Sequence, residues 1–418
     1  MKGKSLANIF KGDKVIWMVF FFLCIISIVE VYSASSSLSY KGGYYWAPII
    51  DHVKKILLGL VALVLMLNVE CKYFKAISAF VLAGSIIMVL WVLVGGQTIN
   101  GANRWINLLG IQFQPSEIAK GALVLATAQI LSAMQTDKGA DRKAFPYILF
   151  TSAFVILPIA AENLSTALLL SVTIFLMMFI GRVPLKQLGS LLAVAVLIGL
   201  LVLSVVMVCG DTNRGRERAG RQVLSEQTAG AQGERPNSFV ARLENRLDTW
   251  KSRIVKFSSS ETVPPEKVDL RDKDAQRNYS YIAIASSGVI GKGPGKSTAR
   301  DGLSQAFSDF IYAIIIEELG IFGALIVAAL YIFLLYRVGI IANRCENTFP
   351  AFLAMGLAIM LVVQALFNML VAVGIAPVTG QPLPLISRGG TSTVINCLYM
   401  GMILSVSRSA KRKPAVAA

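Results

Sequence analysis

Residues 308–336 read SDFIYAIIIEELGIFGALIVAALYIFLLY, an apolar block that one aspartate precedes and two adjacent glutamates interrupt. A helix through this stretch is apolar on every face, and about 20 such residues are needed to cross the hydrocarbon core of a bilayer. The rest of the chain shares this character, since 55% of its 418 residues are hydrophobic and only 15% are charged. Soluble domains are about 25% charged. The stretch therefore predicts a membrane-spanning helix, and the composition predicts a membrane protein.

Similar apolar blocks recur along the whole sequence. Together with the first block they give ten predicted spans, at about 15–33, 50–69, 74–95, 116–135, 146–162, 163–181, 186–208, 311–336, 349–372 and 391–407. We therefore predict an all-α, polytopic membrane protein that forms a single domain over residues 1–418. The fifth and sixth spans meet at Glu162-Asn163, where only a hairpin turn fits. The first span resembles a signal peptide, but its length favours an uncleaved helix.

Positive charges mark one side of this bundle. With the N-terminus inside, the short inner loops and the C-terminal tail are rich in Lys and Arg, which places both termini in the cytoplasm. Residues 209–306 then form a large extracytoplasmic loop between the seventh and eighth spans, and Ser238–Phe257 has the spacing of an amphipathic helix. We explain the net charge of +16 by basic residues that set the membrane topology and that attract anionic lipid headgroups. No nucleic-acid module is recognisable, so no nucleic-acid partner is expected.

Three polar stretches rich in Gly or Pro map to the outer face, where irregular backbone must be buried in protein or line a cavity. The first joins NGANRWI (100–106) to QPSEIAK (114–120). Pro115 is a good first helical residue. Glu117 and Lys120 then lie one turn apart. They either form an ion pair at the helix entrance or face a polar cavity, and the sequence leaves both interpretations open.

The second stretch is SSGVIGKGPGKS (286–297), followed by Asp309 before the eighth span. Its spacing is wrong for a phosphate-binding P-loop. Its free N–H groups with Lys292 and Lys296 could form an anion-binding nest, but a flexible linker is the favoured interpretation. Asp309 has two interpretations. Partial desolvation would make it a better proton acceptor, while an aspartate at a helix N-terminus also interacts with the helix dipole.

The third stretch is GIAPVTGQPLPLISRGGTS (374–392). Its prolines and glycines exclude a regular helix, so we predict a re-entrant loop that places Ser387 and Arg388 in the outer cavity. Arg388 suits a pyrophosphate ligand, although an arginine extending to lipid headgroups fits equally well. The chain has one histidine, His52, so a His-dependent triad or His-cluster metal site is not expected.

Taken in order, these stretches resemble the SEDS family (RodA/FtsW). The matching motifs are NGAxRWI…QPSExxK, SGxxGxG, DFIY…EELG and PVTGxPLPxISxGG. The resemblance implies a lipid II polymerase in the bacterial cytoplasmic membrane, working with a class B penicillin-binding protein and other divisome proteins. It also implies that Asp309, which matches the family's essential aspartate, is catalytic.

The implied reaction is an inverting glycosyl transfer. Asp309 would accept the proton of the acceptor GlcNAc 4-hydroxyl as that oxygen attacks C1 of the donor MurNAc, and undecaprenyl pyrophosphate would leave. No organic cofactor is implied, but a divalent cation could assist the leaving group. The remaining expected substrate-binding residues are Arg104, Trp105, Glu117, Lys120, Lys292, Lys296, Ser387 and Arg388.

The chain departs from the family pattern at three places. LSQAFS (303–308) replaces the usual LPExHT, AENLST (161–166) replaces QPDxGT, and SRGG (387–390) replaces SYGG. Loss of the LPE sequence favours an FtsW-like role at the division septum over a RodA-like role in elongation. Two rival functions stay open on sequence alone, a lipid II flippase and a divisome scaffold.

Overall fold

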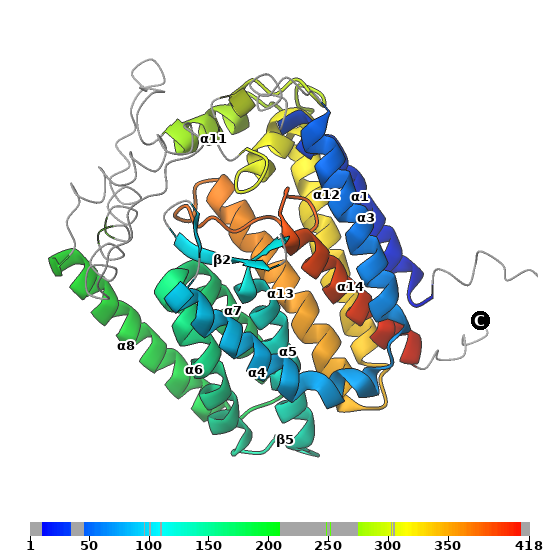
Figure 1. The fold of residues 1–418 in the computed structure, drawn as a ribbon, viewed down its shortest axis with the longest axis vertical. Helices are drawn as coiled ribbons and strands as arrows, with labels where there is room; N and C mark the ends of the chain where they lie inside the picture. Colours follow the sequence, from blue (N-terminus) through cyan, green and yellow to red (C-terminus); the bar gives the residue numbers. More distant parts are fainter. Residues whose placement is uncertain are drawn as a thin grey trace, which may run out of the picture.

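The computed structural model describes residues 11–34, 46–95, 97–99, 102–108, 111–209, 248, 251, 275–301, 303 and 306–410. Helices dominate this part of the chain (Figure 1). Their bounds are α1 Lys14–Ala34, α3 Ala47–Asn68, α4 Cys71–Gly95, α5 Pro115–Ala133, α6 Ala144–Glu162, α7 Leu164–Ile180, α8 Leu185–Cys209, α11 Ala275–Ala285, α12 Ile311–Ala342, α13 Thr348–Ala372 and α14 Thr391–Ser409.

Each predicted span coincides with one of these helices. By length and composition, six of the described helices could cross a membrane, namely α1, α4, α6, α8, α12 and α13, and α7 is a shorter apolar helix. The predicted hairpin turn is confirmed, because α6 ends at Glu162 and α7 begins at Leu164. The Asn163 side chain between them accepts a hydrogen bond from the Thr166 N–H (3.3 Å). The predicted helix within Ser238–Phe257 lies almost wholly outside the described residues.

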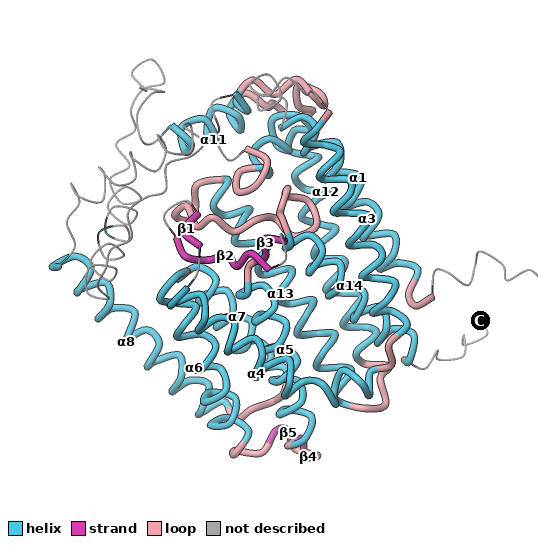
Figure 2. Tube along the Cα trace, in the orientation of Figure 1, coloured by secondary structure: helices cyan, strands magenta, loops and turns pink. Residues whose placement is uncertain are grey.

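A small sheet departs from the expected all-α fold. Strands β1 Gln97–Ile99, β2 Ala102–Leu108 and β3 Ile111–Phe113 pair antiparallel between α4 and α5 (Figure 2), and a two-stranded ladder, β4 Gln135–Thr136 with β5 Gly139–Ala140, lies at the opposite end. Ile99 pairs with Ala102 across the dipeptide Asn100-Gly101. Asn-Gly is the strongest short signal for a β-hairpin. Strand pairing gives hydrogen-bond partners to the backbone N–H and C=O groups of this non-helical segment.

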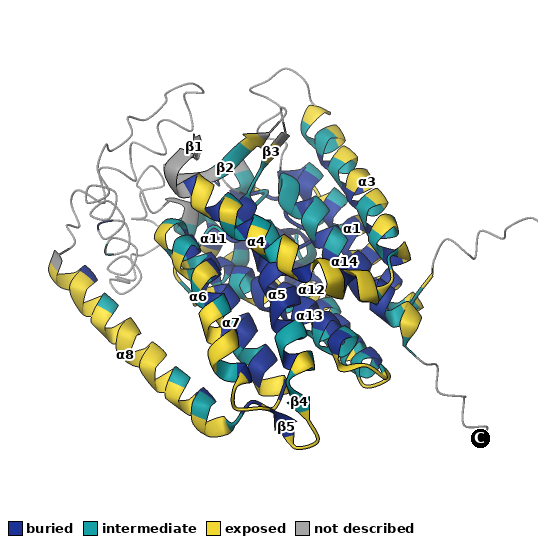
Figure 3. Cartoon of the chain, turned by 60° about the horizontal axis from the view of Figure 1, so that its bottom comes forward, coloured by how far each residue is buried: buried dark blue, intermediate teal, exposed yellow. Residues whose placement is uncertain are grey.

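The core of the bundle is centred on α13, which packs against α5, α7, α12 and α14. Figure 3 shows α13 among the most buried helices, whereas α8 is exposed along most of its length at the edge of the bundle. The exposed side chains of α8 are nevertheless apolar, for example Leu197, Leu201 and Val208. A large apolar surface of this kind suits contact with lipid.

The two ends of the bundle differ in character. At one end, Asp13 before α1 forms an ion pair with Arg337 of α12 (2.7 Å), and its N–H donates to Ser407 of α14 (2.9 Å). At the other end lie the sheet β1-β2-β3, the irregular segments before α12 and α14, and α11, which is drawn at the top of Figure 1. The fold therefore gathers all three polar stretches at one end.

We predict that Asp13→Ala lowers the thermal stability of the detergent-purified protein more than Asp13→Asn does. Asp13 caps α1 by accepting from the N–H of Val15 (2.9 Å), a bond that asparagine keeps, and it also pairs with Arg337. Loss of the cap should cost about 1 kcal/mol. Glu70→Gln breaks an exposed ion pair with Lys72 and should change the melting temperature little.

The Asp13 contribution should also depend on pH. Burial raises the pKa of Asp13, but its hydrogen bonds and ion pair with Arg337 outweigh this effect and hold the pKa below its usual value of 3.8. A lowered folded-state pKa means that the stabilisation is present above the usual value and is lost as the pH falls below it. Asp13→Asn should lack this acid-dependent component, and an unchanged acid profile would contradict the assignment.

Candidate active site

Asp309 lies in a turn that leads directly into α12. The turn spans residues 306–310 and its apolar members, Ala306 and Phe310, are buried with Ala34 of α1 and Val371 of α13. Asp309 itself is half-buried. Anchoring of the apolar neighbours therefore fixes the turn and leaves the aspartate at the mouth of the helix, as the sequence predicted.

The loop between α13 and α14 packs against this turn. The N–H of Arg388 donates to the carbonyl of Phe307 (2.9 Å), and the Ser387 hydroxyl donates to the carbonyl of Ser308 (2.6 Å). Gly380, with φ +67°, approaches from the same loop, and a Cβ atom there would lie 3.3 Å from Oδ2 of Asp309. The structure thus brings the third stretch of sequence to the catalytic candidate.

Two amides on α13 hold the turn and the loop together. The Asn368 side-chain amide donates to the carbonyls of Asp309 (2.9 Å) and Gln381 (2.8 Å). One helical turn earlier, Gln364 donates to the carbonyl of Pro382 (2.9 Å). Both side chains are buried. We did not predict them from sequence, although a Gln and an Asn one turn apart inside an apolar span were a signal, since polar residues within spans are usually functional.

Glu117 and Lys120 form the ion pair that one interpretation predicted. Their side-chain atoms lie 2.9 Å apart with exposures of 4% and 0%. Lys120 also donates to Gln364 (2.8 Å), which links the pair to the loop through α13. The hydroxyl of Tyr399 donates to the Glu117 carbonyl and fastens α14 to the same turn of α5. The pair faces the interior of the bundle, so its contribution to substrate binding stays a prediction.

Strand β2 carries the two remaining candidates of the first stretch. Trp105 is half-buried, and its ring lies 3.9 Å from where a Cβ atom of Gly390 would be. The sheet therefore approaches the end of the re-entrant loop. The backbone of Arg104 belongs to β2, but its side chain lies outside the described residues.

Residues 288–299, which we term the glycine-lysine loop, dock on a break in α12. Gly320 has φ +69°, which interrupts the helix after Glu317, Glu318 and Leu319. Lys292 N–H donates to the Glu317 carbonyl (2.9 Å), and Gly293 N–H donates to the Glu318 carbonyl (2.8 Å). The loop thus satisfies carbonyls that the broken helix leaves free.

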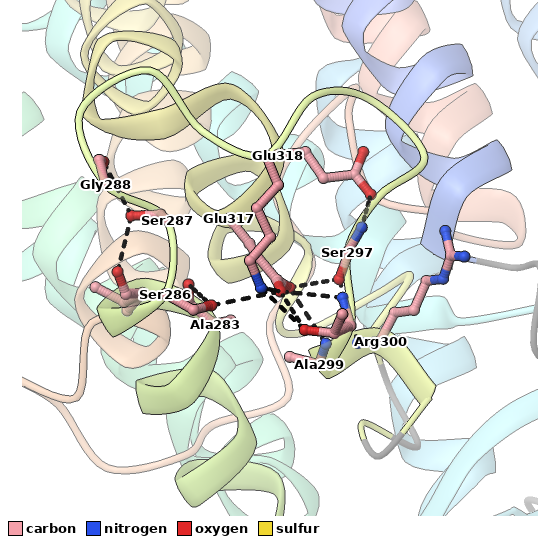
Figure 4. A network of polar contacts seen from close by, with 12 residues as sticks. Ala283, Ser286, Ser287, Gly288, Ser297, Ala299, Arg300, Glu317 and Glu318 are labelled. Carbon is pink, nitrogen blue, oxygen red and sulfur yellow. Dashed lines mark hydrogen bonds and ion pairs between the residues drawn. The ribbon is translucent and has the colours of Figure 1, made fainter.

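The carboxylates of the same two glutamates also hold the loop (Figure 4). Glu317 accepts from the Thr298 N–H (3.0 Å) and the Ser297 hydroxyl (2.5 Å), and Glu318 accepts from the N–H groups of Gly295 (2.9 Å) and Ser297 (3.1 Å). Both glutamates are fully buried. The loop is therefore held in place and is not a flexible linker. Its N–H groups and Lys292 bind the carboxylates of Glu317 and Glu318 rather than an anion from outside the protein.

The basic side chains of these two loops differ in whether they form an ion pair and how far they are exposed to solvent. Lys292 is 2.6 Å from Glu317 in an ion pair, whereas Lys296 is exposed. The Arg388 guanidinium lies over the Phe307 ring (5.4 Å) and only 3.4 Å from Asp51 of α3. Arg388 therefore stands beside the Asp309 turn with a long, weak ion pair.

The arrangement defines a multi-pass helical membrane protein with a half-buried carboxylate at one mouth of the bundle, bordered by the loop between α13 and α14 that carries Ser387 and Arg388. The chain belongs to the FtsW/RodA/SpoVE family, described as cell cycle proteins, which it matches over residues 13–226 and 238–412.

Similar proteins extend over nearly the whole chain. The probable peptidoglycan glycosyltransferase FtsW of Geobacter sp. (strain M18) is 28% identical over 402 residues, covering 94% of this chain and 96% of that protein. The protein of the same description from Coxiella burnetii is 27% identical, covering 94% and 95%.

Two solved structures share the fold. One, described as "Structural coordination of polymerization and crosslinking by a peptidoglycan synthase complex", has a chain with TM-score 0.66, 21% identity and coverage of 96% and 99%. The rod shape determining protein RodA of Thermus thermophilus has TM-score 0.62, 22% identity and coverage of 97% and 100%.

We predict that Asn368→Leu destabilises the folded protein by about 2 to 4 kcal/mol. The leucine has a similar size but leaves the carbonyls of Asp309 and Gln381 without their donor, and each unpaired buried group costs about 1–3 kcal/mol. Thermal unfolding in detergent measures the loss. Asn347→Leu is the matched control, because Asn347 is exposed and its side chain does not cap α13. Equal melting temperatures for the two variants would contradict this role.

Proposed function

We propose that this protein is a peptidoglycan glycosyltransferase that polymerises lipid II into glycan strands during cell division. One observation carries the proposal. The Asp309 carboxylate is half-buried at the mouth of α12, against the loop that contains Gly380, Ser387 and Arg388. Full-length similarity to proteins described as FtsW glycosyltransferases supports it.

In the proposed reaction Asp309 acts as the general base. As the 4-hydroxyl oxygen of the acceptor GlcNAc attacks C1 of the donor MurNAc, its proton passes to the Asp309 carboxylate. The bond from C1 to the pyrophosphate oxygen breaks, and its electron pair leaves with undecaprenyl pyrophosphate. Attack from the face opposite the leaving group inverts C1. A partly dry carboxylate suits this task, and the bond from Asn368 to the Asp309 carbonyl fixes the backbone that carries it.

Arg388 is the proposed partner of the leaving pyrophosphate. Its guanidinium group can donate two parallel hydrogen bonds to phosphate oxygens, and its weak contact with Asp51 (3.4 Å) can be exchanged for them. Exposed Lys296 would add charge at the same mouth, whereas Lys292 is engaged by Glu317. Trp105 would provide a surface for sugar or lipid. The Glu117–Lys120 pair would support the loop before α14 through Gln364.

A divalent cation remains part of the proposal only through the substrate. Among the residues that the structure describes, no group of three or more His, Cys, Asp or Glu side chains converges to hold a metal ion. The described side chains thus do not form a protein cage for a cation. Mg²⁺ often binds through one carboxylate with substrate phosphates. No step above depends on it.

The same proposal includes partners and location. Similarity to a chain of a peptidoglycan synthase complex supports a class B penicillin-binding protein as partner. Other divisome proteins would join them at the septum of the cytoplasmic membrane. Both termini would face the cytoplasm, because the start of α1 and the end of α14, where Asp13 meets Ser407, lie at the end opposite Asp309, whose proposed substrate is extracytoplasmic.

We predict that Asp309→Asn lowers the rate of lipid II polymerisation by roughly 10²-fold or more. The amide cannot accept the hydroxyl proton, yet the bond from Asn368 to the backbone carbonyl survives, so the variant should keep its thermal stability. The assay uses purified protein and lipid II in detergent, with glycan chain formation as the readout. Asp137→Asn, an exposed position beside β4, is the matched control and should keep full activity.

The same assay separates the rival functions. A flippase would form no glycan chains with the wild-type protein. A scaffold would polymerise nothing alone and would tolerate Asp309→Asn in the assembled complex. Wild-type polymerisation that persists in Asp309→Asn would refute the assignment of the base.

A further inference from the structure

His52 is a buried polar side chain that the proposed reaction does not use. It is the one histidine of the chain, it lies on α3, and its relative exposure is 0%. Its Nε2 atom lies 2.7 Å from the hydroxyl oxygen of Ser27 on α1, which is equally buried. The other ring nitrogen, Nδ1, has no hydrogen-bond partner among the described residues. The contact with Ser27 is therefore the one to explain.

The Ser27 hydroxyl determines which nitrogen of His52 carries the proton. This hydroxyl donates to the backbone carbonyl of Ile386 (2.7 Å), and a carbonyl can only accept. Because a hydroxyl has a single proton, its oxygen must then accept from His52, so Nε2 bears hydrogen. A second proton on Nδ1 would be a buried donor without an acceptor, which is costly. The geometry therefore favours a neutral ring with its proton on Nε2.

The Ser27 bond ends in a strained turn of the loop between α13 and α14. Leu385, directly before Ile386, has φ +64°, a conformation that is uncommon for a residue other than glycine. The carbonyls on both sides of it are held, that of Pro384 by the hydroxyl of Tyr331 on α12 and that of Ile386 by Ser27. Strained backbone of this kind persists only where surrounding contacts fix it. Ser27 is thus one of the contacts that hold the turn.

The same turn leads directly to Arg388. The N–H of Arg388 donates to the carbonyl of Phe307 beside Asp309 (2.9 Å), and its guanidinium lies 3.4 Å from Asp51. Asp51 is the residue next to His52 on α3. Helix α3 therefore reaches this segment twice, at the backbone through the histidine and α1, and at the arginine side chain through the aspartate.

We propose that Ser27 and His52 are positioning residues for Arg388. His52, protonated on Nε2, directs the Ser27 hydroxyl toward Ile386, and this bond holds the turn that presents Arg388 to the leaving pyrophosphate. Both residues act through the backbone of Ile386 rather than on the substrate. The effect on the reaction rests on the proposed function, whereas the effect on the loop does not.

The first test determines the tautomer of His52. Full-length protein that contains isotope-labelled histidine and carries a histidine-free affinity tag gives ring signals from this residue alone. Solid-state NMR of the protein in liposomes at neutral pH should show a neutral ring with its proton on Nε2. A proton on Nδ1 alone, or a ring protonated on both nitrogens, would overturn the proposal.

The second test measures backbone amide exchange at residues 386–388 in the full-length protein. Ser27→Ala and His52→Leu remove members of the pair, and exchange should become roughly fivefold faster or more. His52→Gln keeps an amide donor near the position of Nε2 and should exchange like the wild type. Ser405→Ala is the matched control, because it removes a buried serine bond to the Val69 carbonyl at the opposite end of the bundle. Unchanged exchange in Ser27→Ala and His52→Leu would contradict the positioning.

The third test connects the pair to the reaction in the lipid II assay. Ser27→Ala and His52→Leu should lower kcat by roughly tenfold, and His52→Gln should restore most of it. In an Arg388→Ala background the same changes should lower kcat little further, because they act through that arginine. Ser405→Ala should keep the wild-type kcat.

The outcomes separate this inference from the proposed function. Full kcat in both Ser27→Ala and His52→Leu would overturn the role of the pair in the reaction. A wild-type protein that forms no glycan chains would instead refute the proposed function, and amide exchange would then decide whether the pair positions the loop.

Discussion

Every backbone N–H and C=O group at membrane depth must find its partner within the protein, and the Asp309 end of this fold depends on that constraint. Three irregular segments meet there, and each is held by side chains from regular helices. Asn368 and Gln364 of α13 hold the loop before α14 and the Asp309 turn. Glu317 and Glu318 of α12 hold the glycine-lysine loop with both their backbone carbonyls and their carboxylates. Rigid helices thereby give loop residues fixed positions.

The same contacts sort the charges of this end into two groups. Glu117 and Lys120 neutralise each other in the buried interior, and buried Glu317 is neutralised by the partly exposed Lys292. Lone charges there would be costly, whereas paired ones serve as supports. At the mouth, Asp309 and Arg388 are partly exposed, and Lys296 in the glycine-lysine loop is exposed. This division explains how the glycine-lysine loop can engage one lysine in an ion pair and leave the other exposed to solvent.

Sequence reasoning predicted the helices because long apolar blocks with polar ends allow little else in a bilayer. It placed Asp309 at a helix mouth and Ser387 and Arg388 in an irregular loop, since Pro and Gly exclude a helix there. It missed the sheet, although Asn100-Gly101 gave a local signal, because apolar spans dominated the interpretation. It also left the partners of the glycine-lysine loop open. Those partners, Glu317 and Glu318, lie some 20 residues away along the chain, and only packing reveals that a break at Gly320 turns them toward the loop.

The central claim is that Asp309 faces a substrate-accessible cavity on the outer side of the membrane. The most direct test replaces Asp309 by cysteine in a chain whose five native cysteines have been removed. A membrane-impermeant maleimide is then applied to intact spheroplasts and to inverted vesicles, with and without lipid II. We expect labelling in spheroplasts, weak labelling in inverted vesicles, and protection by lipid II. Labelling from the cytoplasmic side alone, or labelling that lipid II does not slow, would contradict the account.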